Sequence, residues 1–110
     1  MNLLITNGTL YVDNFFLCYC EAGNGRDSLP VGRFPLETRY SHAHGEDLPH
    51  VEHVGWIGPS SRADVSCDVV LGRVRGSDGT LPCRSFVGRI LAMLAVAEDD
   101  GKSSAVVIEP

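Results

Sequence analysis

The chain has 110 residues, enough for one domain with a modest hydrophobic core, so we expect residues 1–110 to form a single domain. A composition of 44% hydrophobic and 21% charged residues is ordinary for a globular protein and argues against disorder. Nine basic residues against fourteen acidic ones give a net charge of −5. The few arginines are scattered, so we expect no clustered basic surface for nucleic acid.

The N-terminal segment from Met1 to Thr6 lacks the basic region, long apolar run and cleavage site of a secretory signal. No stretch of the sequence approaches the ~20 apolar residues that a membrane helix needs. We therefore expect a cytoplasmic protein without membrane contact, in which the four cysteines are free thiols. Cys18 and Cys20 lie on one face of an expected strand, and small buried side chains are their simplest interpretation.

The first part of the chain predicts short strands joined by tight turns. Apolar and aromatic runs at Leu3–Thr6, Leu10–Val12 and Phe15–Cys20 predict three strands. Between them lie Asn7-Gly8 and Asp13-Asn14, pairs that favour two-residue hairpin turns.

The middle of the chain is less regular. After a loop at Gly23–Ser28, the segment Leu29–Leu36 carries Pro30 and Pro35, which predicts an edge or irregular strand. Residues 41–49 predict a polar loop.

Two further apolar segments follow this loop. Val51, Val54 and Ile57 predict a short strand, and Val69–Leu71 predicts a core strand.

The clearest predicted element is a helix. Phe86, Ile90 and Leu94 recur every four residues and form one apolar stripe. Thr80 is the expected N-cap, and Pro82 fits the first turn. Gly88 inside this pattern predicts close packing against a strand.

Ala105–Glu109 returns as a last strand. The expected fold class is therefore mainly β (α+β). We expect a small twisted sheet or partial barrel of short antiparallel strands, with one C-terminal helix packed on it.

The segment from His53 to Gly72 places one histidine and one cysteine around a polar loop, with Cys67 just before an apolar strand. A thiol activated by a histidine is commonly built from these two residue types.

The order of short motifs along nearly the whole chain resembles a family of small, uncharacterised domains frequent in phages and prophages. The motifs are Leu10–Asp13, Phe16–Tyr19, Leu29–Phe34, Asp47–Pro49, His53–Gly55, Cys67 with Val70–Gly72, and Phe86–Leu94. The His-x-Gly motif followed by a cysteine is also similar to the signature of L,D-transpeptidases, β-rich cysteine enzymes that cross-link peptidoglycan. This second resemblance covers about twenty residues.

The sequence departs from these family patterns at two positions. Ser66 occupies the position of the usual glycine, and Trp56 that of an asparagine. One extra residue between Cys67 and Gly72 leaves the alignment open. In the alternative alignment Asp68 takes the place of Cys67, and the nucleophile is lost.

The resemblance implies acyl transfer or hydrolysis on peptidoglycan stem peptides. His53 takes the proton of Cys67, and the thiolate forms a thioester that an amine or water resolves. Backbone N–H groups around Ser66 and Cys67 hold the oxyanion, and Asp64 or a backbone carbonyl orients His53.

Ligand binding is expected from four further residues: Trp56, Arg62, Arg73 and His50. Either arginine suits a substrate carboxylate, and Trp56 is either a core anchor or a pocket wall. Zinc bound by Cys67 and the histidines at 42, 44, 50 and 53 is an alternative, but their spacing matches no specific motif. We therefore predict no metal and no cofactor.

Three function classes follow. The first is a phage-encoded L,D-transpeptidase-like cysteine enzyme acting on a peptidoglycan peptide. The second is a non-catalytic phage protein that binds a small molecule, such as a host signalling nucleotide, or inhibits a host defence protein. The third is a virion or assembly component, with homo-oligomers or phage proteins as partners through strands near Pro30 and Pro35.

Overall fold

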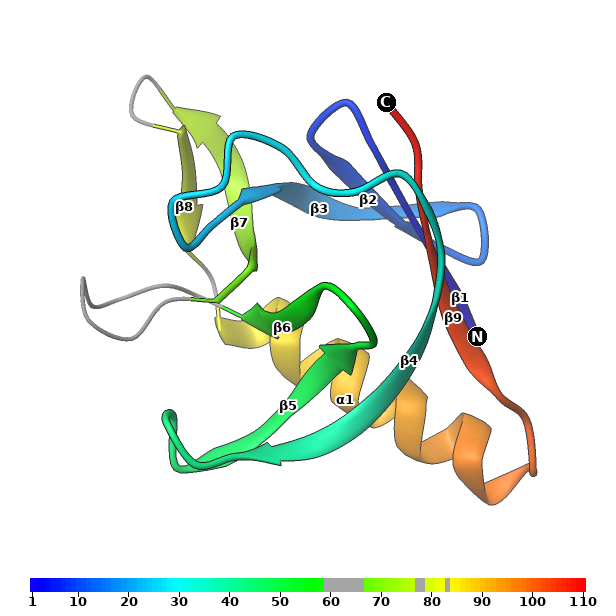
Figure 1. The fold of residues 1–110 in the computed structure, drawn as a ribbon. Helices are drawn as coiled ribbons and strands as arrows, with labels where there is room; N and C mark the ends of the chain where they lie inside the picture. Colours follow the sequence, from blue (N-terminus) through cyan, green and yellow to red (C-terminus); the bar gives the residue numbers. More distant parts are fainter. Residues whose placement is uncertain (59–66, 77–78, 83) are drawn as a thin grey trace.

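The computed structural model describes residues 1–58, 67–76, 79–82 and 84–110. The chain forms nine strands and one helix (Figure 1). The elements are β1 (Asn2–Thr6), β2 (Thr9–Val12), β3 (Phe15–Ala22), β4 (Gly32–Ser41), β5 (Glu46–Val51), β6 (Gly55–Gly58), β7 (Val69–Gly76), β8 (Gly79–Pro82), α1 (Arg84–Asp99) and β9 (Ser104–Ile108).

Eight of these strands close into a barrel in the order β3-β2-β1-β9-β4-β5-β6-β7, because β7 pairs back onto β3. β8 extends the sheet beyond β7. Two pairs, β1–β9 and β6–β7, are parallel, and the others are antiparallel. The mainly β prediction with one C-terminal helix is confirmed, but the sheet is more closed than the predicted twisted sheet or partial barrel.

The two predicted hairpin turns are confirmed. Asn7-Gly8 joins β1 to β2, and Asp13-Asn14 joins β2 to β3. All four residues have positive φ angles, 49° and 73° in the first turn and 46° and 75° in the second. Such turns match the right-handed twist of the strands that they connect.

The prediction of an edge strand around Pro35 is wrong. β4 lies inside the sheet, between β9 and β5. Pro35 is tolerated there because its backbone faces the β5 side just past the last residue pair of that ladder, Leu36 with Val51. The carbonyl of Pro35 accepts the N–H of Glu52 at 3.0 Å. The sheet therefore loses only one hydrogen bond at this position, the one that a backbone N–H would donate.

The polar loop predicted at residues 41–49 is also partly wrong, because β5 begins at Glu46. Leu48 and Pro49 are fully buried in this strand. The polar residues around Leu48 and Pro49 favoured a loop prediction, although the barrel buries this strand on both faces.

The helix is confirmed, but its predicted start is not. Thr80 lies in β8, opposite Arg75, so it is not the N-cap, and α1 begins at Arg84. Pro82 also belongs to β8. The prediction of close packing at Gly88 is wrong, because this residue is exposed and no described atom outside its own helix backbone lies within 4 Å of a Cβ built on it.

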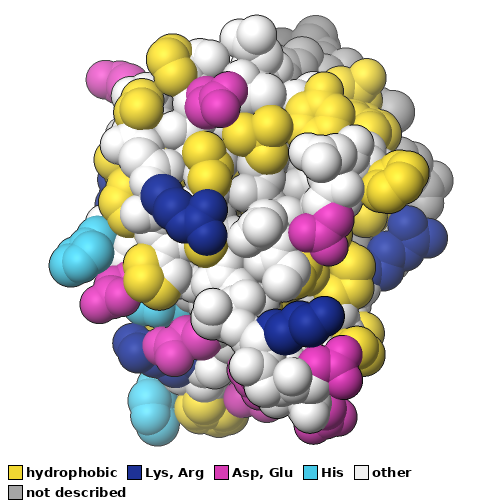
Figure 2. Space-filling model, turned by 90° about the vertical axis from the view of Figure 1, so that its right-hand side faces the viewer, with side chains coloured by type: hydrophobic (Ala, Val, Ile, Leu, Met, Phe, Trp, Pro, Cys, Tyr) yellow, Lys and Arg dark blue, Asp and Glu magenta, His cyan; other side chains and the backbone are white. Residues whose placement is uncertain are grey.

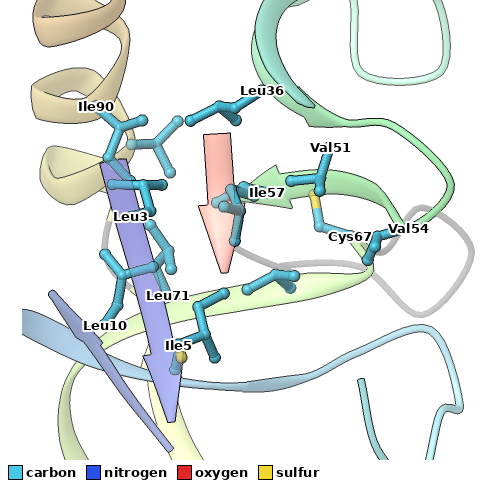
Figure 3. Close-up of a cluster of buried hydrophobic side chains, with 14 of the residues drawn as sticks. Leu3, Ile5, Leu10, Leu36, Val51, Val54, Ile57, Cys67, Leu71 and Ile90 are labelled. Carbon is cyan, nitrogen blue, oxygen red and sulfur yellow. The ribbon is translucent and has the colours of Figure 1, made fainter. Parts of the chain in front are cut away.

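A single hydrophobic cluster joins the helix to the barrel. Ile90 and Leu94 are buried and α1 lies against β4, β5, β6 and β7. Figure 3 shows side chains from several strands and from the helix meeting in this cluster, among them Leu3, Leu36 and Ile57. Cys18 and Cys20 belong to it as buried free thiols, as predicted.

Two glycines give opposite predictions for substitution by alanine. Gly88→Ala should raise the free energy of unfolding by about 0.5–1 kcal/mol, because alanine is the better helix former and has free space there. Gly23→Ala should lower it by about 1–3 kcal/mol, since its Cβ would lie 2.1 Å from the carbonyl oxygen of Cys67. Urea denaturation of both variants checks the pair, and equal effects would contradict this packing.

Candidate functional site

Three side chains form a chain of contacts at one end of β4 and β5. The Sγ of Cys67 lies 3.5 Å from the Nε2 of His44. The other ring nitrogen of His44, Nδ1, lies 2.8 Å from the Oγ of Ser41. The thiol therefore contacts an imidazole, and the imidazole contacts a hydroxyl that orients it. This is the arrangement of a base-assisted nucleophile.

Local backbone geometry holds the histidine in this position. Ser41 ends β4, and its carbonyl accepts the N–H groups of His44 and Gly45, at 3.2 and 2.7 Å. Gly45 adopts a left-handed conformation with φ of 69°, which lets the chain turn into β5. The Oγ of Ser41 also accepts the N–H of His44 at 3.3 Å, so the hydroxyl of this serine contacts His44 twice.

The sulfur of Cys67 is held from the opposite side by Gly58. A Cβ built on Gly58 would lie 2.9 Å from this sulfur, so only glycine leaves room for it. Cys67 is 0% exposed, and Figure 3 shows it beside Val51 and Val54. His44 is partly exposed and is therefore the member of the chain nearer to solvent.

The predicted pairing of His53 with Cys67 is wrong. The side chain of His53 is 76% exposed, and its Nε2 lies 3.9 Å from a carboxylate oxygen of Glu52. It stands in the turn between β5 and β6, in a left-handed conformation with φ of 68°. His44 takes its place, and the grouping of His44 with Cys67 in the zinc alternative was the only signal of this contact.

Two predicted ligand-binding residues, His50 and Trp56, are brought together. They are cross-strand neighbours in β5 and β6, and their rings meet edge to face with centroids 4.7 Å apart. Glu37 of β4 lies opposite His50, so the three residues form a row across three strands. Trp56 is half-buried and packs against the hydrophobic cluster.

His50 has an unusual environment. Burial lowers the pKa of its imidazole below the ordinary 6.5, and the positive charge of Arg39 lowers it further. Its Nδ1 is buried and has no hydrogen-bond partner among the residues that the structure describes. A buried polar atom without a partner is rare in folded proteins.

Asp68, the alternative occupant of the nucleophile position, has a different role. Its carboxylate accepts the backbone N–H of Trp56 at 3.0 Å and the Nε–H of Arg26 at 3.3 Å. The backbone N–H of Asp68 donates to the carbonyl of Trp56 at 2.9 Å, so it is not available to hold an oxyanion. Arg26 also donates to the carbonyl of Val54 at 3.0 Å. Asp68 therefore ties three segments together, and Cys67 is the residue beside the imidazole.

The remaining predicted site residues are not placed. Ser66, Asp64 and Arg62 lie outside the described residues. The backbone of Arg73 lies in β7, but its side chain is outside the described part. Within the described part of the chain, no group of three or more His, Cys, Asp or Glu side chains is arranged to hold a metal ion.

Removing the carboxylate of Asp68 should destabilise the protein. Asp68→Ala leaves the N–H of Trp56 and the guanidinium of Arg26 without this acceptor, and should lower the free energy of unfolding by about 2–3 kcal/mol. Asp27→Ala, in the same loop as Arg26 but exposed, should change it by less than about 0.5 kcal/mol. Chemical denaturation checks both, and a neutral Asp68→Ala would contradict the anchoring role.

The lowered pKa of His50 predicts a loss of stability at acid pH. Below about pH 6.5 the unfolded chain takes up the imidazole proton before the folded chain does, so the free energy of unfolding decreases as pH falls. The variant His50→Gln should lack this part of the slope between pH 7 and 5. Denaturation at several pH values measures it, with exposed His42→Gln as the control.

Comparisons with protein families, with curated proteins and with solved structures find no match to this chain. No helix in the described part is long and apolar enough to cross a membrane.

Proposed function

We propose that this chain is a cysteine enzyme of acyl transfer, in which His44 assists Cys67 and peptidoglycan stem peptides are the substrate class. The observation that carries the proposal is the continuous contact from the sulfur of Cys67 through His44 to Ser41. The substrate class rests on the resemblance of the sequence to phage domains and L,D-transpeptidases.

The reaction uses the partners in order. Nε2 of His44 accepts the thiol proton, and the sulfur of Cys67 attacks the acyl carbon of a peptide. The S–C bond forms, the C–N bond breaks, and the proton passes from His44 to the leaving amine. An acceptor amine or a water then attacks the thioester, gives its proton to His44, and releases the thiol on protonation. Ser41 is a positioning residue, since its hydroxyl contacts the imidazole and the backbone N–H of His44 and not the thiol.

The row of His50 and Trp56 lies close to this thiol. Leu48 lies two residues before His50 in β5. A Cβ built on Gly58 would lie 3.7 Å from the Cδ2 of Leu48 and 2.9 Å from the sulfur of Cys67, so Gly58 lies between the two side chains. Two residues of strand span about 7 Å. A group held against the rings of Trp56 and His50 is thus within reach of an acyl group at the sulfur.

A second function, non-catalytic binding of a small ligand, is favoured by the burial of Cys67. Its sulfur belongs to the hydrophobic cluster, and fully buried cysteines are commonly inert. Under this alternative the ligand binds at His50 and Trp56, and Cys67→Ala leaves binding unchanged.

The pH dependence of thiol alkylation separates the two functions. Wild type is treated with iodoacetamide between pH 5.5 and 9, and the modified cysteines are identified by peptide mass analysis. Cys18 and Cys20 are as buried as Cys67 and show how far burial alone slows the reaction. If His44 activates Cys67, its labelling below pH 7 should exceed theirs by about tenfold or more, because the thiolate forms below the ordinary thiol pKa of about 8.5.

Matched variants identify the base. His44→Ala should reduce labelling of Cys67 below pH 7 by about tenfold, and Ser41→Ala should shift its pH profile by a smaller amount. His53→Ala, in an exposed turn, should match wild type. Labelling of Cys67 as slow as that of Cys18 in every variant would overturn catalysis and leave the binding function.

A further inference from the structure

The two neighbours of β4 separate along its length. β9 pairs with β4 from Gly32 to Leu36, and β5 pairs with it from Leu36 to Ser41. Beyond Leu36, therefore, β4 has a described strand on the β5 side alone. Figure 1 shows β4 and β9 diverging at this point, with the C-terminal half of α1 behind the gap.

Backbone groups of β4 point into this gap. The carbonyls of Pro35 and Ser41 accept N–H groups from the β5 side, so the odd-numbered residues face β5. Thr38 and Tyr40 face the other way, because backbone groups alternate along a strand. No described residue donates to or accepts from the backbone of either on that side. An extended strand with free donors and acceptors is a template for another chain.

A cavity of about 470 Å³ adjoins this edge. Its apolar part comes from Leu36 of β4 and Leu94 of α1, and its rim carries Glu52, Glu98 and Lys102. A groove between a strand edge and a helix suits an extended peptide, which pairs by main-chain hydrogen bonds and places alternate side chains in the groove.

The charges around the groove favour a basic peptide. Glu37 and Arg39, which also line the cavity, are paired with each other. The remaining rim has two carboxylates, of Glu52 and Glu98, against the ammonium of Lys102. Figure 2 shows several acidic side chains, with Lys and Arg side chains among them, in the lower part of one face of the molecule.

We propose that the open edge of β4 binds an extended, basic segment of a partner protein by strand addition. A second copy of this chain is a poorer occupant, because each copy carries a net charge of −5 and pairing two β4 edges would bring the acidic rims together. The site uses backbone groups that the proposed acyl transfer does not use.

A synthetic peptide tests the proposal. Fluorescence anisotropy is measured with a labelled heptapeptide that alternates lysine and valine, and with the same peptide carrying glutamate in place of lysine. The lysine peptide should bind and the glutamate peptide should bind at least tenfold more weakly. In wild type, the lysine peptide should also slow hydrogen exchange of the Thr38 and Tyr40 amides.

Variants of the strand edge provide the control. Thr38→Pro removes one outward N–H donor without removing a hydrogen bond of the barrel. This variant should weaken binding of the lysine peptide by about tenfold. Thr38→Val keeps the donor and should bind as wild type does. Glu98→Lys should weaken binding by about threefold, whereas Asp99→Lys, outside the cavity lining, should weaken it less.

Several results would overturn the proposal. These are equal binding of the two peptides, binding of neither, equal affinity of the proline and valine variants, or unchanged exchange at both amides. A dimer in light scattering that Thr38→Pro dissolves would show that the edge pairs with a second copy instead.

Discussion

The closure of the barrel depends on one buried carboxylate, that of Asp68. Its oxygens accept from the backbone of β6 at Trp56 and from the side chain of Arg26 in the loop after β3. The backbone carbonyl of Asp68 accepts the N–H of Gly23, and this hydrogen bond brings the end of β3 to the start of β7. A buried charge is costly unless it is paired and hydrogen-bonded, so these segments must assemble together around Asp68. The parallel β6–β7 pair and the β3–β7 pair that closes the barrel both begin beside this residue.

The same constraint determines the surroundings of the thiol. Close contacts at Asp68 require glycine at two neighbouring positions, because a Cβ on Gly55 would lie 1.9 Å from the carboxylate and a Cβ on Gly23 would meet the carbonyl of Cys67. With its neighbour held in this way, Cys67 enters the hydrophobic cluster and meets His44 across the sheet. The two candidate residues therefore have different surroundings: the carboxylate of Asp68 is hydrogen-bonded to Trp56 and Arg26, and the sulfur of Cys67 lies beside the imidazole of His44.

Sequence patterns predicted the features that arise within a few residues. Asn7-Gly8 specifies its turn through local backbone preferences, and the spacing of Ile90 and Leu94 specifies a helical stripe. Barrel closure joins β3 to β7 across some fifty positions, and no periodicity records such a pairing. The prediction of the His53–Cys67 pair failed for the same reason. His53 is nearer to Cys67 along the chain, but the β4–β5 hairpin carries His44 to it in space, within a segment whose polar residues predicted a loop.

The thiol chain includes Ser41 at the end of β4, the strand that also carries the open edge, yet the two sites use different groups. Ser41 turns its backbone toward β5, where its carbonyl holds the hairpin and its hydroxyl holds the imidazole of His44. The backbone groups of Thr38 and Tyr40 point away from β5, beyond the last residue pair of β4 with β9. Because alternate residues of a strand present their hydrogen-bonding groups to opposite neighbours, a strand added at the gap consumes no donor or acceptor of the thiol chain. Loss of peptide binding in Thr38→Pro should therefore leave the alkylation of Cys67 unchanged, so the two proposals can fail independently.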